Sequence, residues 1–135
     1  MSRSNYAERE ADWQGICWRG AVKKAIKGKR GQAFLREMLV ALDALPDKRL
    51  IDADLEQDGA VCAIGAVGRA RGLDMSEVDP EDSYTVARLF GISNALAREI
   101  AYINDDEGEA YYWRETPEQR YVRVRAWIEQ RVSFP

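Results

Sequence analysis

The sequence predicts an all-α fold, a compact single-domain bundle of five or six helices. Three observations support this fold class. Several segments repeat apolar residues at the three- and four-residue spacing of an amphipathic helix, and helix-start and helix-end signals border them. In the middle of the chain, residues 59–68 carry no charge and are mostly small. The sequence therefore predicts a central helix over 60–71, with the other helices packed around it.

The glycines of this central segment indicate close packing. Val61, Ile64, Gly65 and Gly68 share one stripe of the predicted helix, and an interior glycine costs about 1 kcal/mol relative to alanine. The usual compensation is close approach, because the missing Cβ atoms admit the backbone of a second element. We therefore expect another helix to cross at Gly65, and leucine at that position to destabilise the fold.

Before the central segment, the chain predicts a flexible N-terminus over 1–8 and a single helical domain over 9–135. The apolar pattern suits a first helix from Glu8 to Ile26, with Gly15 and Gly20 as candidate break points.

A second helix follows a turn that the paired glycines of 28–31 predict. Its pattern of apolar residues covers Gln32–Leu45, and Pro46 ends it. For residues 48–57 the sequence leaves a short strand and a single helical turn as open alternatives.

Capping signals place the later helices. The Asp79-Pro-Glu-Asp82 segment predicts a helix start and a helix running to Phe90. Gly91 predicts a turn, and Ser93 predicts the cap of a helix over Asn94–Ile103. The Thr116-Pro-Glu-Gln119 segment has the spacing of a capping box and predicts the last helix.

Composition narrows the function classes. The 135 residues carry a net charge of −3 and include no histidine, which removes the commonest general base and metal ligand. We therefore predict no enzyme activity, no catalytic residue, no metal site and no cofactor.

Cys17 and Cys62 are expected to be buried free thiols, because they lie in apolar contexts of a chain without a secretory signal or membrane-spanning run. A cytoplasmic location follows as an expectation.

One candidate functional segment is Val86–Ile100, which has the spacing of a helix-turn-helix. If it binds DNA, its second helix offers Ser93, Asn94 and Arg98 to a groove. Simple packing of two helices also satisfies this spacing. A basic segment adds a second candidate contact for nucleic acid, or for another anionic partner. Its residues are Lys23, Lys24, Lys27, Lys29 and Arg30.

An aromatic and acidic segment is the better candidate for a partner-binding surface. Aromatic residues beside arginine are typical of interface hot spots, although closure of the core by a loop explains them equally. Asn104 is expected to end its helix as a C-cap and Asp105 to fix the following turn; the register does not match a calcium loop. The candidate contacts are Tyr111, Tyr112, Trp113, Arg114, Asp105, Asp106, Glu107 and Glu109.

Four motifs together resemble a group of small uncharacterised phage and prophage proteins, and more remotely bacterial domains of unknown function. The resemblance implies a compact helical domain and a mobile-element context, without an activity, and it implies structural roles for Cys62 and for Asn104-Asp105. The motifs are Trp18-Arg-Gly-Ala21, Cys62-Ala-Ile-Gly-Ala66, Ile103-Asn-Asp105, and Thr116-Pro-Glu-Gln119 followed by Trp127.

The leading functional hypothesis is stoichiometric binding to a host protein or protein complex by a phage-type accessory protein in the bacterial cytoplasm. An inhibitor of host defence, such as an anti-CRISPR protein, is its sharpest form, and this form depends on the resemblance. The alternative is a helix-turn-helix DNA-binding regulator that uses residues 86–100. No membrane partner is expected. The sequence leaves the partner's identity and the oligomeric state open.

Overall fold

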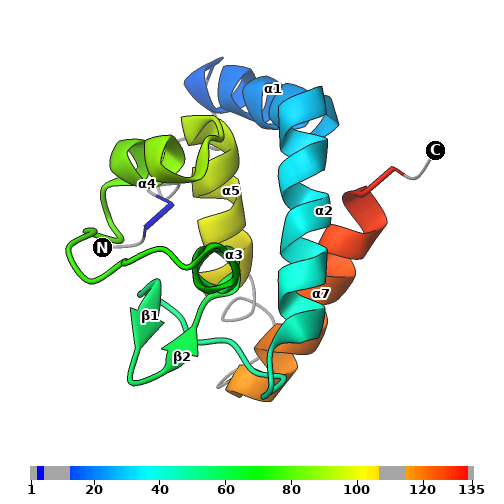
Figure 1. The fold of residues 1–135 in the computed structure, drawn as a ribbon. Helices are drawn as coiled ribbons and strands as arrows, with labels where there is room; N and C mark the ends of the chain where they lie inside the picture. The colour runs from blue at the N-terminus through cyan, green and yellow to red at the C-terminus, as the bar shows by residue number, and fades with distance from the viewer. Residues whose placement is uncertain (1–2, 5–12, 107–114, 134–135) are drawn as a thin grey trace.

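A computed structural model describes residues 3–4, 13–106 and 115–133, with only the backbone described for 13–16 (Figure 1). Within these ranges the fold is all-α, as predicted, with six helices and one two-stranded hairpin. None of the described helices is long and apolar enough to cross a membrane. The elements are α1 (Trp13–Lys27), α2 (Lys29–Ala44), β1 (Glu56–Gln57), β2 (Ala60–Val61), α3 (Ala63–Arg71), α4 (Ser83–Phe90), α5 (Asn94–Asp105) and α7 (Pro117–Arg131).

Helix α3 lies at the centre of the bundle, as the sequence predicts. Figure 1 shows it end-on, with α2 and α5 along its sides, and it contacts both. Every residue of 61–68 is buried. Gly72 ends the helix in the left-handed conformation, with φ of 72°, which favours glycine because a Cβ atom is disfavoured there.

The segment that packs against Gly65 is the connector between α2 and β1, residues 45–55. This corrects the prediction that a helix crosses at Gly65. A Cβ atom at Gly65 would lie 1.9 Å from the backbone carbonyl oxygen of Leu55. At Gly68 the nearest atom is the Sδ of Met75, at 2.3 Å from such a Cβ. Gly65 therefore leaves room for the backbone of the connector, and Gly68 leaves room for the flexible side chain of Met75.

The start of the central helix also differs from the prediction of residue 60. Ala60–Val61 pairs with Glu56–Gln57 in an antiparallel hairpin, and α3 begins at Ala63. Asp58 and Gly59 join the strands with φ of 51° and 81°, and two positive φ values are what a two-residue type I′ hairpin turn requires. Of the two alternatives for residues 48–57, the structure therefore has the short strand, at Glu56–Gln57.

Two other helix starts are shifted. Helix α2 begins at Lys29 instead of Gln32, so the predicted turn over 28–31 reduces to Gly28. Gly31 permits this, because a Cβ atom there would lie 1.8 Å from the carbonyl oxygen of Ala25. Helix α4 begins at Ser83, since Asp82 accepts from the backbone N–H of Thr85 and is the N-cap.

Asp79, the predicted cap of α4, instead accepts from the N–H of Glu81 in the turn before the helix. Helix α1 continues through Gly15 and Gly20 without a break. Both cysteines are free as expected, but Cys17 is exposed while Cys62 is buried. The prediction that Cys17 is buried is therefore wrong, because its position on α1 faces solvent although its neighbours in the sequence are apolar.

The caps of α5 and α7 confirm their predictions. Ser93 Oγ accepts from the N–H of Leu96. Thr116 Oγ1 accepts from the N–H of Gln119 at 3.1 Å, and Gln119 Oε1 accepts from the N–H of Thr116 at 2.9 Å. Two N–H groups that have no partner inside the helix are thereby satisfied.

Replacing Thr116 by alanine is expected to lower the free energy of unfolding by about 1 kcal/mol. The change removes the hydroxyl that accepts from Gln119, while the exposed methyl group contributes little. Urea denaturation followed by circular dichroism measures the loss. Thr116→Ser keeps the hydroxyl and is the matched control; equal losses in the two variants contradict the capping role.

Candidate functional site

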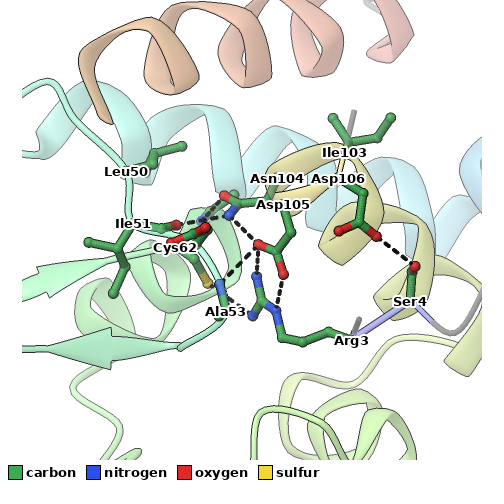
Figure 2. A network of polar contacts seen from close by, with 12 residues as sticks. Arg3, Ser4, Leu50, Ile51, Ala53, Cys62, Ile103, Asn104, Asp105 and Asp106 are labelled. Carbon is green, nitrogen blue, oxygen red and sulfur yellow. Dashed lines mark hydrogen bonds and ion pairs between the residues drawn. The ribbon is translucent and has the colours of Figure 1, made fainter. Parts of the chain in front are cut away.

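Polar residues at the C-terminal end of α5 meet the N-terminal residues Arg3 and Ser4 in a buried network (Figure 2). Arg3 donates from Nε and Nη2 to the two carboxylate oxygens of Asp105, each at 2.6 Å. The side chains of Arg3 and Asp105 are only 4% and 10% exposed. Two parallel charge-assisted hydrogen bonds between planar groups form one of the stronger polar contacts in proteins.

Other parts of the chain hold Asp105 in place. Its Oδ1 accepts from Asn104 Nδ2 at 2.8 Å and from the N–H of Ala53 at 3.2 Å. Ala53 has φ of 67°, a conformation that is unfavourable for alanine by about 1–2 kcal/mol. Its N–H therefore reaches the carboxylate from a strained position in the connector.

Asn104 connects this carboxylate to the start of α3. Its Nδ2 also donates to the carbonyl of Ile51 at 2.9 Å, and its Oδ1 accepts from the N–H of Ala63 at 3.1 Å. Ala63 is the first residue of α3, whose N–H has no partner within the helix. Asn104 thus joins α5, the connector and the central helix.

Cys62 completes the network as the N-cap of α3. Its Sγ accepts from the N–H of Gly65 at 3.3 Å and from Arg3 Nη1 at 3.6 Å. Burial alone would lower the pKa of Arg3, but attraction to the Cys62 sulfur and the hydrogen bonds and charge of Asp105 outweigh it. The pKa of Arg3 is therefore raised above its ordinary value, and its guanidinium is charged.

Ser4 is held beside Arg3 by Arg98 of α5 and by its C-cap residue Asp106. Ser4 Oγ donates to Asp106 Oδ2 at 3.0 Å, and the Ser4 carbonyl accepts from Arg98 Nε at 2.7 Å. The Arg98 guanidinium also lies over the Trp18 ring, 4.2 Å from its centroid. Of the predicted flexible N-terminus over 1–8, the structure describes only Arg3 and Ser4, and both are buried.

Helix α5 ends later than predicted. Asn104 and Asp105 are helical, and the C-cap is Asp106. Both side chains turn inward because they find buried partners there. Arg123 of α7 donates to the carbonyl of Ile103 at 2.6 Å and so satisfies one of the last carbonyls of the helix.

The predicted partner-binding surface is only partly described. Asp105 is buried and Asp106 half-buried, and both are bonded to the N-terminal residues. In the described structure the Asp105 carboxylate therefore faces the chain's own Arg3. The remaining predicted contacts lie outside the described residues; they are Glu107, Glu109, Tyr111, Tyr112, Trp113 and Arg114.

The residues of the DNA-binding hypothesis are divided between surface and interior. Ser93 caps α5, Asn94 donates from Nδ2 to Ser83 Oγ at 2.6 Å, and Arg98 is only 7% exposed. Helix α5 therefore presents no Arg98 side chain for a groove. The basic residues at the junction of α1 and α2 are all exposed; they are Lys23, Lys24, Lys27, Lys29 and Arg30.

A groove runs along the outer face of α7. It has a volume of about 630 Å³, and Val122, which is 67% exposed, lies in it. This groove was not predicted from the sequence, although a branched apolar residue away from the buried stripe of Tyr121, Val124 and Ile128 is its signal. Its lining includes Glu118, Gln119, Val122, Arg123, Ala126 and Trp127.

No group of three or more histidine, cysteine, aspartate or glutamate residues in the described part of the chain is placed to hold a metal ion. Comparisons with known protein families, with curated proteins and with solved structures gave no match to this chain. The resemblance to phage and prophage proteins therefore stays a prediction.

Proposed function

We propose that this protein acts by stoichiometric binding to another protein, and that the groove on α7 is its docking surface. The observation that supports this proposal is the exposure of Val122 in the groove along a well-capped helix. The same helix already buries Tyr121, Val124 and Ile128 on its inner side, so packing of the bundle does not require the apolar residue at 122.

The composition of the groove suits a protein partner. Ala126, which is exposed, and Trp127, which is only 7% exposed and belongs to the hydrophobic core, lie near Val122, while Glu118, Gln119 and Arg123 supply polar groups around them. An apolar centre with a polar rim is the usual anatomy of an interface. An amphipathic helix whose apolar residues enter such a groove is a common mode of recognition.

The class of partner follows from the sequence resemblance. A phage or prophage context makes a protein or complex of the bacterial host the proposed target, and inhibition of a host defence, as by an anti-CRISPR protein, the proposed consequence. Glu115, which lines the groove, directly follows the predicted contacts Tyr111–Arg114 in the sequence. The groove and these predicted contacts are therefore adjacent in the chain.

DNA binding is the second candidate, because the basic residues at the α1–α2 junction are exposed together. Arg98, in contrast, is bonded to Ser4 and stacked on Trp18. The DNA-binding form of the proposal consequently depends on phosphate contacts from the junction, and such contacts weaken steeply as salt rises.

Replacing Val122 by glutamate is expected to abolish retention of the partner protein, because it puts a charge into the apolar centre of the groove. The tagged full chain is used to capture proteins from a bacterial lysate, with nuclease and at high salt. Val40→Glu is the matched control, since Val40 on α2 is 70% exposed and lies outside the groove.

The result that supports the proposal is a discrete protein retained by the unmodified chain and by Val40→Glu, and lost with Val122→Glu. Equal retention by all three chains contradicts the groove as the docking surface. Loss of all captured material after nuclease or high salt contradicts protein binding and favours the DNA-binding alternative. Circular dichroism of both variants checks that they are folded.

A further inference from the structure

The carboxylate that binds Arg3 is positioned by residues other than Arg3. Asn104 Nδ2 and the N–H of Ala53 both donate to Asp105 Oδ1, and Asn104 is itself fixed by Ile51 and Ala63. Asp105 is thus a preorganised buried anion that faces the guanidinium (Figure 2). Preorganisation of this kind reduces the free-energy cost of binding a ligand.

Two side chains of α5 and the side chain of its C-cap residue contact three different groups of the Arg3-Ser4 segment. Asp105 binds the guanidinium, Arg98 donates to the Ser4 carbonyl, and Asp106 accepts from the Ser4 hydroxyl. Arg98 and Asp105 are seven positions apart and therefore lie on the same face of the helix, and Asp106 is the C-cap that follows them. The contacts therefore recognise the Arg3 side chain, the Ser4 carbonyl and the Ser4 hydroxyl separately, as a peptide-binding site does.

The bound segment is remote in sequence from the residues that hold it. Arg3 and Asp105 are 102 positions apart. Burying such an ion pair carries a large desolvation cost and is an inefficient way to gain stability. Two hydrogen bonds in one plane, however, select a guanidinium over the ammonium of lysine. Recognition of arginine is what this arrangement does well.

We propose that the C-terminal end of α5 is a binding site for a peptide segment with an arginine followed by a hydroxyl residue, and that the chain's own Arg3-Ser4 occupies it in cis. A partner protein that carries such a segment exchanges with Arg3-Ser4 and releases the N-terminus. This site is separate from the groove on α7, so the two proposals are tested independently.

The test uses the full chain with Arg3→Ala, which removes the guanidinium from the Asp105 carboxylate and keeps that carboxylate. The probe is a fluorescein-labelled Ser-Arg-Ser-Asn peptide, whose sequence is that of residues 2–5, and binding is followed by fluorescence anisotropy. The peptide is expected to bind Arg3→Ala at least about tenfold more tightly than the unmodified chain, because a tethered competitor acts at an effective concentration in the millimolar range.

Two controls separate recognition from a structural role. A peptide with lysine in place of arginine is expected to bind Arg3→Ala about tenfold more weakly, because it makes one contact where arginine makes two. The double variant Arg3→Ala/Asp105→Asn is expected to lose binding. If the ion pair is only structural, Arg3→Ala is less stable but binds the peptide no better than the unmodified chain, and the proposal is overturned.

A second variant covers the case in which Arg3→Ala does not fold. Arg3→Lys keeps a positive charge beside Asp105, but it forms a weaker single contact. The arginine peptide is then expected to bind Arg3→Lys more tightly than it binds the unmodified chain. Equal affinities for these two folded chains overturn the proposal as well.

Discussion

Replacing Asp105 by alanine is expected to lower the free energy of unfolding by about 3–5 kcal/mol. The variant leaves the buried guanidinium of Arg3 without its partner, and it removes the acceptor used by Asn104 and by the N–H of Ala53. An unpaired buried charge and unsatisfied buried donors are among the costliest single defects in a fold. Equilibrium denaturation in urea measures the loss.

The chain offers a matched control in Asp43. Arg125 Nε donates to Asp43 Oδ1 at 2.7 Å, and Nη2 donates to Oδ2 at 3.2 Å, but the Asp43 side chain is 54% exposed. Asp43→Ala is therefore expected to cost about 0–1 kcal/mol, because water screens this pair. A loss with Asp105→Ala that is no larger than the loss with Asp43→Ala contradicts the role of burial.

A double-mutant cycle isolates the contact itself. Arg3→Ala/Asp105→Ala removes both charges, so the double variant is expected to be less destabilised than the sum of the two single variants. Additive losses indicate that Arg3 and Asp105 contribute separately. The cycle thus distinguishes the ion pair from the other hydrogen bonds of Asp105.

Replacing Gly65 by alanine is expected to lower the free energy of unfolding by about 3 kcal/mol. The new Cβ atom meets the carbonyl oxygen of Leu55 at 1.9 Å and its carbonyl carbon at 2.9 Å. Both are backbone atoms, so no rotamer change relieves the contact, and the connector has to move away from α3. That movement also strains the hydrogen bond from the N–H of Cys62 to the Leu55 carbonyl.

Two other glycines serve as controls for this prediction. A Cβ atom at Gly20 meets nothing within 4 Å, so Gly20→Ala is expected to stabilise the protein by about 0.4–1 kcal/mol. At Gly68 the nearest atom belongs to the flexible side chain of Met75, and an intermediate loss is expected. If Gly65→Ala changes the free energy of unfolding by less than about 0.5 kcal/mol, the close approach does not limit stability.

Prediction from the sequence was most accurate where a few neighbouring residues determine the structure. The capping box at Thr116–Gln119 and the cap at Ser93 each depend on hydrogen bonds within one turn. The hairpin at Asp58-Gly59 is equally local. The Asp58-Gly59 pair is a typical hairpin-turn sequence. The helix start was nevertheless predicted at residue 60 instead of Ala63, because the residues that follow the turn carry no charge.

The candidate site was less predictable, because its contacts join distant segments. Asn104 and Asp105 have the composition of a helix end, and the local interpretation as a cap and a turn followed from that. The structure instead turns both inward, toward Arg3, Ile51 and Ala63. No periodicity within residues 94–106 indicates a partner 102 positions away.

By itself, then, the sequence determined the all-α class, the central position of the small-residue helix and the caps that start α5 and α7. The tertiary structure alone decided that Asp105 faces Arg3, that Arg98 is buried against Trp18 and that Val122 lies in a groove. The physical reason is the range of the interactions. Caps and helix periodicity are short-range properties of the chain, whereas burial and charge pairing depend on which segments the completed fold brings together.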